Sequence, residues 1–597
     1  MPKTTASNAG AAPELTPDAA SDRKERRLVG AMIAVTLFLT SFSALLGYAI
    51  VPPGMQFVGT AYNIDDYNVY LSWLRQTTDG LFFQHNLFTT EPQPSLLFSF
   101  LFSAMGLAVR ITHLPSAIVL HLTRIAGGLG LLWLAYRFMV LCFPKDRAAR
   151  LTSLGLLCFS SGFGWTQWSQ WSDKNPSSAP IDAFQPEAYT FLSIYLTPLF
   201  AVATLLILGT LYSLLLSFRT GKMRYASLAG LCGFLLGNIH SYDVFHVAAA
   251  WGLFLTAWTI WKRGRNVARV WVHAIWALAL TMPTTLYIYY IYRTNAVFKE
   301  RANTPTLSPA LWHYILGYGF VFLLAICAFV LIGRRYKQWK AASVDSSEVS
   351  GTRDADGTIG GWATGSTFLF VASWAVAGLC VIYLPFGFQR KMLMGEHIPL
   401  CLLAGWAAST LTRSLAPRVR SAALSALVLL TFPSNALFLV RDANHLLNNR
   451  SETSALPFLS ANYVSSVEWL NKNTPKGAAI VMSPIDDFNN PGALYVPGMT
   501  GHAVWAGHWS ETPQYGDRIQ EYRRFSDSET SDDERRAFLR DTHAQYFVFS
   551  RALAKATYTS RAGQTHTFSD FAASPPPYLI PVNANDGYVV FQIDLAK

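Results

Sequence analysis

The sequence predicts a mainly α-helical, polytopic membrane protein that carries a small α/β domain at its C-terminus. Of its 597 residues, 51% are hydrophobic and 14% are charged, whereas an average soluble domain has about 25% charged residues. Apolar runs near the roughly 20 residues that a bilayer-spanning helix needs recur between Val29 and Val440. The six cysteines follow no CxxC or Cys/His metal spacing. This composition excludes a soluble enzyme, a disulfide scaffold and a disordered chain.

The formal net charge of +11 would by itself allow a nucleic-acid partner. Most Lys and Arg residues, however, lie in short loops between apolar runs, where such residues set the orientation of a membrane protein. We therefore expect the lipid bilayer, and no nucleic acid, as the partner of these residues.

Three regions follow from the pattern along the chain. Residues 1–27 are rich in Ala, Thr, Ser and Pro and read as a disordered cytoplasmic tail. Residues 28–440 form the expected transmembrane domain, with an outer loop at 52–115. Residues 441–597 form the expected extracytoplasmic α/β domain, with helices at 464–471 and 532–540 and strands at 478–482, 546–549 and 587–593.

The apolar segment 95–111 decides the orientation of the membrane domain. If it lies along the membrane surface, the loops placed inside carry seventeen Lys and Arg residues, and the outer loops after residue 140 carry six. A spanning segment would reverse this bias, against the positive-inside rule. The surface-lying assignment gives about eleven spans, a cytoplasmic N-terminus and an extracytoplasmic C-terminus. The expected spans are 28–51, 116–141, 150–165, 188–217, 226–239, 244–262, 268–292, 309–333, 366–386, 396–412 and 420–440.

Asp65 and Asp66 stand at the start of a predicted helix in the first outer loop. Adjacent carboxylates raise each other's pKa, and one of them can take a proton from an incoming hydroxyl group or hold a cation. Alternatively, Asn63 caps the helix while both acids complement its dipole. The spacing alone leaves these alternatives open.

The architecture resembles that of the membrane-embedded GT-C glycosyltransferases, such as protein O-mannosyltransferases, the aminoarabinose transferase of lipid A and oligosaccharyltransferases. The resemblance rests on a first span, an outer loop with an acidic pair and a tyrosine four positions on (Asp66, Tyr70), a surface-lying helix, further spans and an outer α/β domain. It implies that Asp65 or Asp66 acts as the catalytic base, or holds a divalent cation such as Mg²⁺ or Mn²⁺ if one is used. The usual Asp-Glu pair is Asp-Asp here, so the division of roles stays open.

Basic side chains on the expected outer side are candidates for binding a phosphate group. Arg124 lies inside an apolar run, and Arg390 and Lys391 run against the positive-inside bias. His240 closes a short span, where Asp243 could fix its tautomer. The alternatives are snorkelling or a carboxylate partner for Arg124, lipid headgroups for Arg390 and Lys391, and a hydrogen-bonded helix end for His240.

Two further groups complete the candidate site. Asp182, Glu187 and Asp243 form a possible second acidic site. Contacts to the acceptor or the sugar are expected from Tyr70, Trp505, His508 and Trp509, although a packed interface between domain and membrane would also explain the last three. His502 and His508 lack helical metal-ligand spacing.

The sequence therefore predicts a glycosyltransferase in a bacterial plasma membrane. The resemblance implies a polyprenyl-phosphate-linked sugar as donor, inversion at the anomeric carbon, and a glycan, lipid or protein as acceptor. No nucleotide-binding motif is present. The alternative is a transporter or flippase of a lipid-linked substrate, which should show related halves and charges at the membrane midplane.

Overall fold

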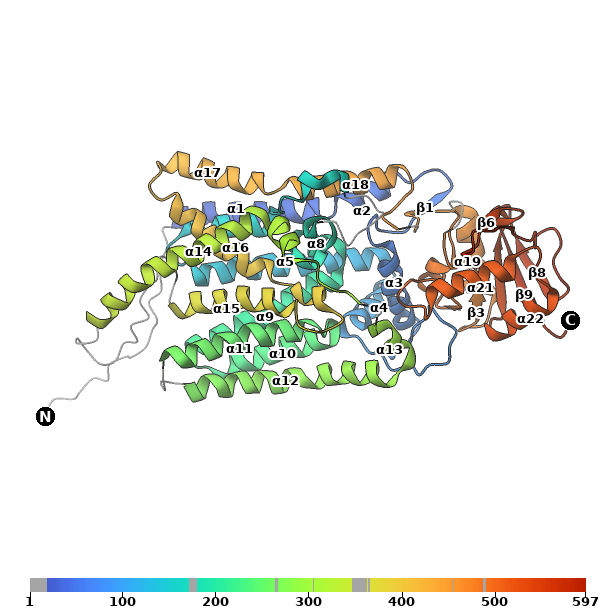
Figure 1. Cartoon of the computed structure of the whole chain (residues 1–597), viewed down its shortest axis with the longest axis horizontal. Coiled ribbons are helices and arrows are strands. Elements are labelled where there is room, and N and C mark those ends of the chain that lie inside the picture. Colours follow the sequence, from blue (N-terminus) through green and yellow to red (C-terminus); the bar gives the residue numbers. More distant parts are fainter. Residues whose placement is uncertain are drawn as a thin grey trace.

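The computed structural model describes residues 19–170, 180–262, 267–303, 305–345, 362, 365–453, 455–486 and 490–597. A long bundle of helices forms one part of the molecule, and a smaller sheet-containing domain packs at one end of it (Figure 1). The predicted fold class, a helical membrane protein with a C-terminal α/β domain, is confirmed.

The helices of the bundle run along its long axis (Figure 1). They are α1 (Ala19–Leu39), α2 (Phe42–Ala49), α5 (Ser116–Cys142), α6 (Arg147–Phe159), α8 (Thr190–Leu196), α9 (Pro198–Thr220), α10 (Met223–Ile239), α11 (Asp243–Lys262), α12 (Val267–Thr294), α14 (Leu311–Asp345), α15 (Gly365–Val381), α16 (His397–Leu411), α17 (Pro417–Leu430) and α18 (Pro433–Leu447). Shorter elements connect them: η1 (Gly164–Gln170), α7 (Ile181–Phe184), η3 (Pro186–Ala188), α13 (Ala296–Asn303) and η5 (Gln389–Leu393).

Within the described residues, five helices are long and apolar enough to cross a membrane: α5, α9, α11, α12 and α14. The count rises to seven if each of two bent pairs, α1 with α2 and α17 with α18, forms one span. Shorter helices occupy the expected spans 150–165, 226–239, 366–386 and 396–412. The number eleven therefore stays a prediction.

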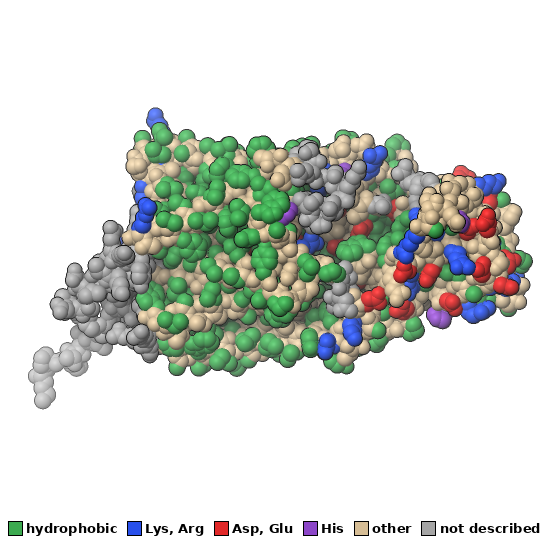
Figure 2. Space-filling model, viewed as in Figure 1, with side chains coloured by type: hydrophobic (Ala, Val, Ile, Leu, Met, Phe, Trp, Pro, Cys, Tyr) green, Lys and Arg blue, Asp and Glu red, His purple; other side chains and the backbone are tan. Residues whose placement is uncertain are grey.

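The surface of the bundle is apolar. Hydrophobic side chains cover the face seen in Figure 2, whereas acidic and basic side chains gather on the sheet domain. Large apolar residues stay exposed on the bundle, for example Trp133 at 56% and Ile260 at 69%. An apolar surface of this extent is stable only in lipid, so the chain is an integral membrane protein.

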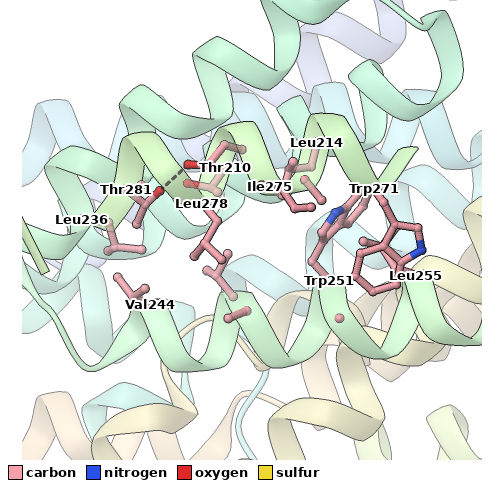
Figure 3. A pocket seen from close by; sticks show the side chains of 16 residues that line it. Thr210, Leu214, Leu236, Val244, Trp251, Leu255, Trp271, Ile275, Leu278 and Thr281 are labelled. Carbon is pink, nitrogen blue, oxygen red and sulfur yellow. Dashed lines mark hydrogen bonds between the residues drawn. The ribbon is translucent and has the colours of Figure 1, made fainter. Parts of the chain in front are cut away.

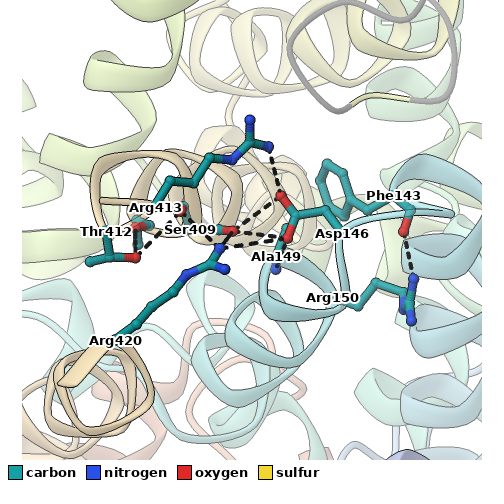
Figure 4. Close-up of polar contacts among 9 residues, drawn as sticks. Phe143, Asp146, Ala149, Arg150, Ser409, Thr412, Arg413 and Arg420 are labelled. Atoms are coloured by element: carbon teal, nitrogen blue, oxygen red, sulfur yellow. Dashed lines mark hydrogen bonds and ion pairs between the residues drawn. The ribbon is translucent and has the colours of Figure 1, made fainter. Parts of the chain in front are cut away.

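Ion pairs and hydrogen bonds stabilise the end of the bundle that lies farther from the sheet domain. The Asp146 side chain caps α6 by accepting the Ala149 N–H at 3.0 Å, and it also accepts from Ser409 Oγ at 2.9 Å and Arg413 Nη2 at 3.0 Å (Figure 4). Arg420 donates to Ser409 Oγ at 2.7 Å. These basic residues belong to the loops that the sequence places inside the cell.

Helix α1 begins within the expected disordered tail. Residues 1–18 lie outside the described residues, but residues 19–27 are helical. Glu25 in this segment accepts from Arg150 Nε and Nη2, each at 2.8 Å, and from Tyr136 Oη at 3.0 Å. Helix α1 therefore begins before residue 28, because Glu25 has partners on α5 and α6.

Two helices of the first outer loop, α3 (Ile64–Thr78) and α4 (Phe100–Thr112), pack together near the sheet domain. Tyr70 of α3 stacks on Phe102 of α4 at a centroid distance of 5.3 Å, and Trp73 meets the same ring at 4.9 Å. The 13 residues of α4 give a length of about 20 Å, which is less than the ~30 Å hydrocarbon core.

The C-terminal domain is built on a five-stranded sheet in the order β4-β3-β5-β9-β8. Its strands are β3 (Ala479–Val481), β4 (Ala503–Val504), β5 (Tyr546–Ser550), β8 (Leu579–Ala584) and β9 (Tyr588–Ile593), and β3 is parallel to both β4 and β5. The helices are α19 (Ala461–Asn473), α20 (Val496–Thr500), α21 (Tyr515–Ser526) and α22 (Asp532–Asp541), with η6 (Ala493–Tyr495) and η7 (Arg551–Leu553). The five elements expected from the sequence are present.

Two small sheets complete the domain. Strand β1 (Met55–Phe57) of the first outer loop pairs with β2 (Phe458–Ser460), and β6 (Thr557–Thr559) pairs with β7 (Thr565–Thr567). The first of these pairs joins the outer loop to the start of the C-terminal domain.

Arg124 requires a correction to the sequence analysis, which assigned it to phosphate binding. Its side chain is 2% exposed. It donates to the carbonyl oxygens of Thr40 and Ile194, at 3.0 and 2.9 Å, and to Ser41 Oγ at 2.9 Å. Thr40 and Ser41 lie at the break between α1 and α2, and Ile194 lies near the end of α8. Arg124 thus satisfies carbonyl groups that the broken helices leave without intrahelical partners.

We predict that Arg124→Gln destabilises the protein. A buried acceptor that loses its donor costs roughly 1–3 kcal/mol, and Arg124 serves three acceptors. The melting temperature of the purified protein in lipid nanodiscs should fall clearly. Arg137→Gln, which changes an exposed arginine on the same helix, is the matched control and should have little effect. Equal melting temperatures for the two variants would contradict the structural role of Arg124.

Candidate functional site

The acidic pair lies in the first turn of α3. Asn63, with a left-handed φ of 52°, precedes the helix, and its N–H donates to Glu452 Oε1. The Asn63 side chain makes no capping hydrogen bond to the backbone. It donates from Nδ2 to Asp66 Oδ2 at 2.9 Å instead. Asn63 therefore orients one carboxylate of the pair, Asp66, rather than capping the helix.

The two acids have different surroundings. Asp66 keeps 37% of its side chain exposed and lines a cavity. Asp65 accepts from Thr453 Oγ1 at 3.3 Å, at the link between the bundle and the C-terminal domain. Burial raises the pKa of Asp65 above its ordinary value, against the opposing effect of His508. The structure thus places Asp66, and not Asp65, on the cavity wall.

The cavity that Asp66 lines has a volume of about 190 Å³ and lies between the bundle and the sheet domain. We call it the site cavity. Seven residues of the predicted site line it together: Asp66, Tyr70, Glu187, His240, Arg390, Lys391 and Trp509. They come from five separate stretches of the chain, so the fold brings together residues that are more than 400 positions apart.

The wall of the cavity also carries basic groups. Lys391 Nζ lies 4.9 Å from the ring centroid of Tyr242. Arg390, which precedes Lys391 in η5, donates its backbone N–H to the Thr306 carbonyl at 3.1 Å. His240 Nδ1 faces Asp243 Oδ2 at 2.9 Å, which leaves Nε2 as the ring atom not used in this contact.

The acidic side of the cavity includes a buried carboxyl group. Glu187 is 5% exposed, and within the described part of the chain its Oε2 atom has no hydrogen-bond partner. A buried oxygen of this kind needs a donor. Glu187 therefore offers an acceptor to a hydroxyl group bound in the cavity.

His508 of the C-terminal domain approaches the cavity from outside the bundle. Its Nδ1 accepts the backbone N–H groups of Ser510 and Glu511, each at 3.2 Å. Because Nδ1 acts as an acceptor, the proton of the neutral ring lies on Nε2, which faces Asp66 Oδ1 at 3.6 Å. His508 thus presents an N–H group toward the cavity carboxylate.

Besides Asp65, Arg124 and His508, three more predicted site residues lie outside the set that lines the cavity. Asp182 accepts the backbone N–H groups of Gly162 and Gly164 at 3.0 Å, so it stabilises a turn. Asp243 is fully buried behind His240. Trp505 is 5% exposed in the core of the C-terminal domain, under Arg518. The sequence analysis expected Trp505 to contact the acceptor or the sugar. The structure corrects this expectation, because the Trp505 side chain lies in the domain core.

Sequence reasoning missed several residues that line the cavity, among them Tyr242, Tyr292 and Thr306. Tyr242 belongs to the turn after α10 that the sequence analysis singled out, so its position next to His240 was a usable signal. Tyr292 and Thr306 lie at the end of α12 and in the loop after α13. No periodicity or motif marks them.

Among the described residues, the doublet Asp65–Asp66 is not part of a group of three or more His, Cys, Asp or Glu side chains placed to hold a metal ion. Within the described residues, the cluster whose ligand atoms lie close enough to hold a metal consists of Asp527, Glu529 and His566 in the C-terminal domain. Asp65 and Asp66 instead accept from Thr453 and Asn63, respectively. We therefore derive no step of the chemistry from a bound cation.

No family model matches the sequence, and no curated protein matches it. Solved structures do match. The arabinofuranosyltransferase AftD from Mycobacteria aligns with a TM-score of 0.52 and 15% identity over 95% of this chain, which spans 40% of the length of AftD. The oligosaccharyltransferase AglB from Archaeoglobus fulgidus aligns with a TM-score of 0.50 and 10% identity, covering 93% of this chain and 76% of AglB. The structure of ArnT from Cupriavidus metallidurans has a TM-score of 0.47 and 13% identity.

The likeness extends over both parts of the molecule, since AftD and AglB each cover more than nine-tenths of this chain. At these identities the likeness concerns the arrangement of the backbone. The chain has the fold of the membrane glycosyltransferases of the GT-C type.

Proposed function

We propose that this protein transfers a sugar from a polyprenyl-phosphate donor to an acceptor hydroxyl group on the extracytoplasmic face, with inversion at the anomeric carbon. The observation that carries the proposal is the site cavity, whose wall carries Asp66 together with Arg390 and Lys391. Such a displacement requires a base at the acceptor hydroxyl group and positive charge at the departing phosphate. A carboxylate and a pair of cations on one cavity can supply both.

Asp66 acts as the base in this mechanism. It takes the proton of the acceptor hydroxyl as the acceptor oxygen attacks the anomeric carbon. The bond from that carbon to the phosphate oxygen breaks, and its electron pair leaves with the phosphate. A single displacement of this kind inverts the configuration. Asn63 and His508 hold Asp66 in place from two sides.

The basic side of the cavity stabilises the departing phosphate. Lys391 and Arg390 supply positive charge where negative charge develops. His240, whose Nδ1 contacts Asp243, directs its other nitrogen toward the cavity and donates to a phosphate oxygen when that nitrogen is protonated. Glu187 accepts from a sugar hydroxyl group.

An apolar groove supports a lipid-linked donor. It lies between α9, α10, α11 and α12 and is lined by side chains that include Leu214, Val244, Trp251, Leu278 and Thr281 (Figure 3). Val244 follows Asp243 at the start of α11, next to His240 of the site cavity. A lipid chain that lies in the groove would bring its phosphate to this end. The matched AglB structure is a complex with a dolichol-phosphate.

The alternative, a transporter or flippase, is less well supported. Intramembrane charges of transporters gather at the midplane on broken helices. Here Asp66 and Lys391 lie where the bundle meets the C-terminal domain, and the buried Arg124 binds backbone carbonyl groups.

The central test replaces each acid of the doublet. Asp66→Asn should lower the turnover number by about 10²–10⁴-fold, the usual contribution of a general base. Asp65→Asn should retain more activity, because Asp65 contacts Thr453 and not the cavity. The measurement is sugar transfer in nanodiscs from a panel of polyprenyl-phosphate monosaccharides. Unimpaired transfer by Asp66→Asn would remove the mechanism.

Lys391→Met should raise the KM for the lipid-linked donor by roughly 10- to 100-fold, which corresponds to the ~1.5–3 kcal/mol of a hydrogen bond to a charged group. Lys299→Met is the matched control, since Lys299 is an exposed cation on α13. An equal effect of both substitutions would mean that a general surface potential, and not a phosphate site, is being measured.

The orientation can be tested by cysteine labelling. In a variant without the six native cysteines, Lys555→Cys in the C-terminal domain should react with a membrane-impermeant maleimide in intact spheroplasts. Lys145→Cys, at the opposite end of the bundle, should react only after permeabilisation. The reverse pattern would place the C-terminal domain in the cytoplasm.

A further inference from the structure

Trp509 is an exception within its own loop. Its side chain is 51% exposed, whereas His508, Glu511 and Thr512 are 1%, 3% and 4% exposed. A large aromatic side chain that stays exposed between buried neighbours is informative, because the folding of the loop gains nothing from its exposure. The Trp509 ring lies nearly parallel to the His508 ring, at a centroid distance of 6.0 Å.

Contacts on two sides fix the loop that carries Trp509. On one side, Asn86 Nδ2 donates to the Glu511 carbonyl at 2.7 Å, and Thr512 Oγ1 donates to the Phe88 carbonyl at 2.7 Å. On the other side, Glu300 of α13 accepts the N–H of Gln514 at 3.0 Å. These contacts hold the backbone of the loop that carries Trp509.

A second cavity of about 110 Å³ lies on the other side of Trp509. We call it the outer cavity. It runs between α13 and the loop 509–515, and its lining is mostly polar. Trp509 and Ser510 line both the outer cavity and the site cavity. A molecule bound in the outer cavity would thus extend past Trp509 toward Asp66.

The two cavities differ in charge. The site cavity carries charges of both signs, with Asp66 and Glu187 as well as Arg390 and Lys391 on its wall. The charged residues that line the outer cavity, within the described part of the chain, are Glu300 and Glu511. An anionic molecule would meet two carboxylates there, which disfavours phosphorylated or uronic acceptors.

From this combination we infer that the acceptor is a neutral glycan, bound in the outer cavity with a sugar ring on the face of Trp509. One face of a pyranose or furanose ring exposes C–H groups, which pack on an aromatic ring, while its hydroxyl groups bind polar atoms at the edge. Glu300, Glu511 and the backbone of the loop 509–515 supply such atoms. The inference rests on the proposed function, and it names the substrate class of the second half of the site.

The experiment measures glycan binding without transfer. Purified protein in nanodiscs is titrated by calorimetry with neutral tetrasaccharides of mannose, glucose or arabinose, and with tetragalacturonate as the acidic counterpart. At least one neutral tetrasaccharide should bind, and tetragalacturonate should bind at least tenfold more weakly. Trp509→Ala should weaken the binding of the neutral tetrasaccharide at least tenfold, and Trp509→Phe, which keeps an aromatic face, less than threefold.

Trp133→Ala is the matched control, because Trp133 is 56% exposed on α5 and does not line either cavity. It should leave binding unchanged. The inference is overturned if no neutral tetrasaccharide binds, if tetragalacturonate binds as tightly, or if Trp509→Ala behaves like Trp133→Ala. Asp66→Asn separates the two ideas: loss of transfer with unchanged tetrasaccharide binding supports both, whereas unimpaired transfer removes the proposed function and leaves the binding site standing.

Discussion

The cost of desolvating polar groups inside a bilayer is the constraint on which the rest of this structure depends. Within hydrocarbon, a charge or an unsatisfied carbonyl group must find a partner in the protein itself. Arg124 shows the consequence, because its guanidinium group serves carbonyl groups at two helix ends. Groups that must meet a substrate cannot be satisfied in this way. Asp66 and Lys391 accordingly lie where the bundle meets the C-terminal domain, and there the cavity can supply water or a ligand.

The C-terminal domain completes the site rather than standing beside it. It supplies His508 and Trp509, and the first outer loop holds it through Asn86 and through the pairing of β1 with β2. Asp65 adds a further contact, to Thr453. Because the walls of the site cavity come from both parts, a shift of the domain by a few ångströms would change the distance from His508 to Asp66. The position of the domain and the state of the base are therefore coupled.

Sequence reasoning located the site better than it assigned the roles within it. The acidic doublet, His240 and the pair Arg390–Lys391 stood out because charged or polar residues are rare next to apolar runs, and all of them lie on or next to the site cavity. Arg124 stood out for the same reason. The sequence pattern does not show where neighbouring helices break, so it could not indicate that Arg124 binds their carbonyl groups. Trp505 and Trp509 are four positions apart in one loop, and only the strand β4 decides that the first is buried. No sequence pattern indicates that Tyr292 and Thr306 line the cavity.

The geometry of a helix also explains why the doublet is not a pair of equivalent acids. Consecutive residues in an α-helix point about 100° apart, since one turn takes 3.6 residues. When Asp66 faces the cavity, Asp65 must face elsewhere, and here it meets the link at Thr453. Burial raises the pKa of Asp65, and the neighbouring carboxylate of Asp66 acts in the same direction. In the mechanism that we propose, Asp66 meets the acceptor, while Asp65 contacts Thr453 at the link to the domain that carries His508. Because the two acids are adjacent, the residue at the cavity and the residue that contacts the C-terminal domain lie on the same turn of α3.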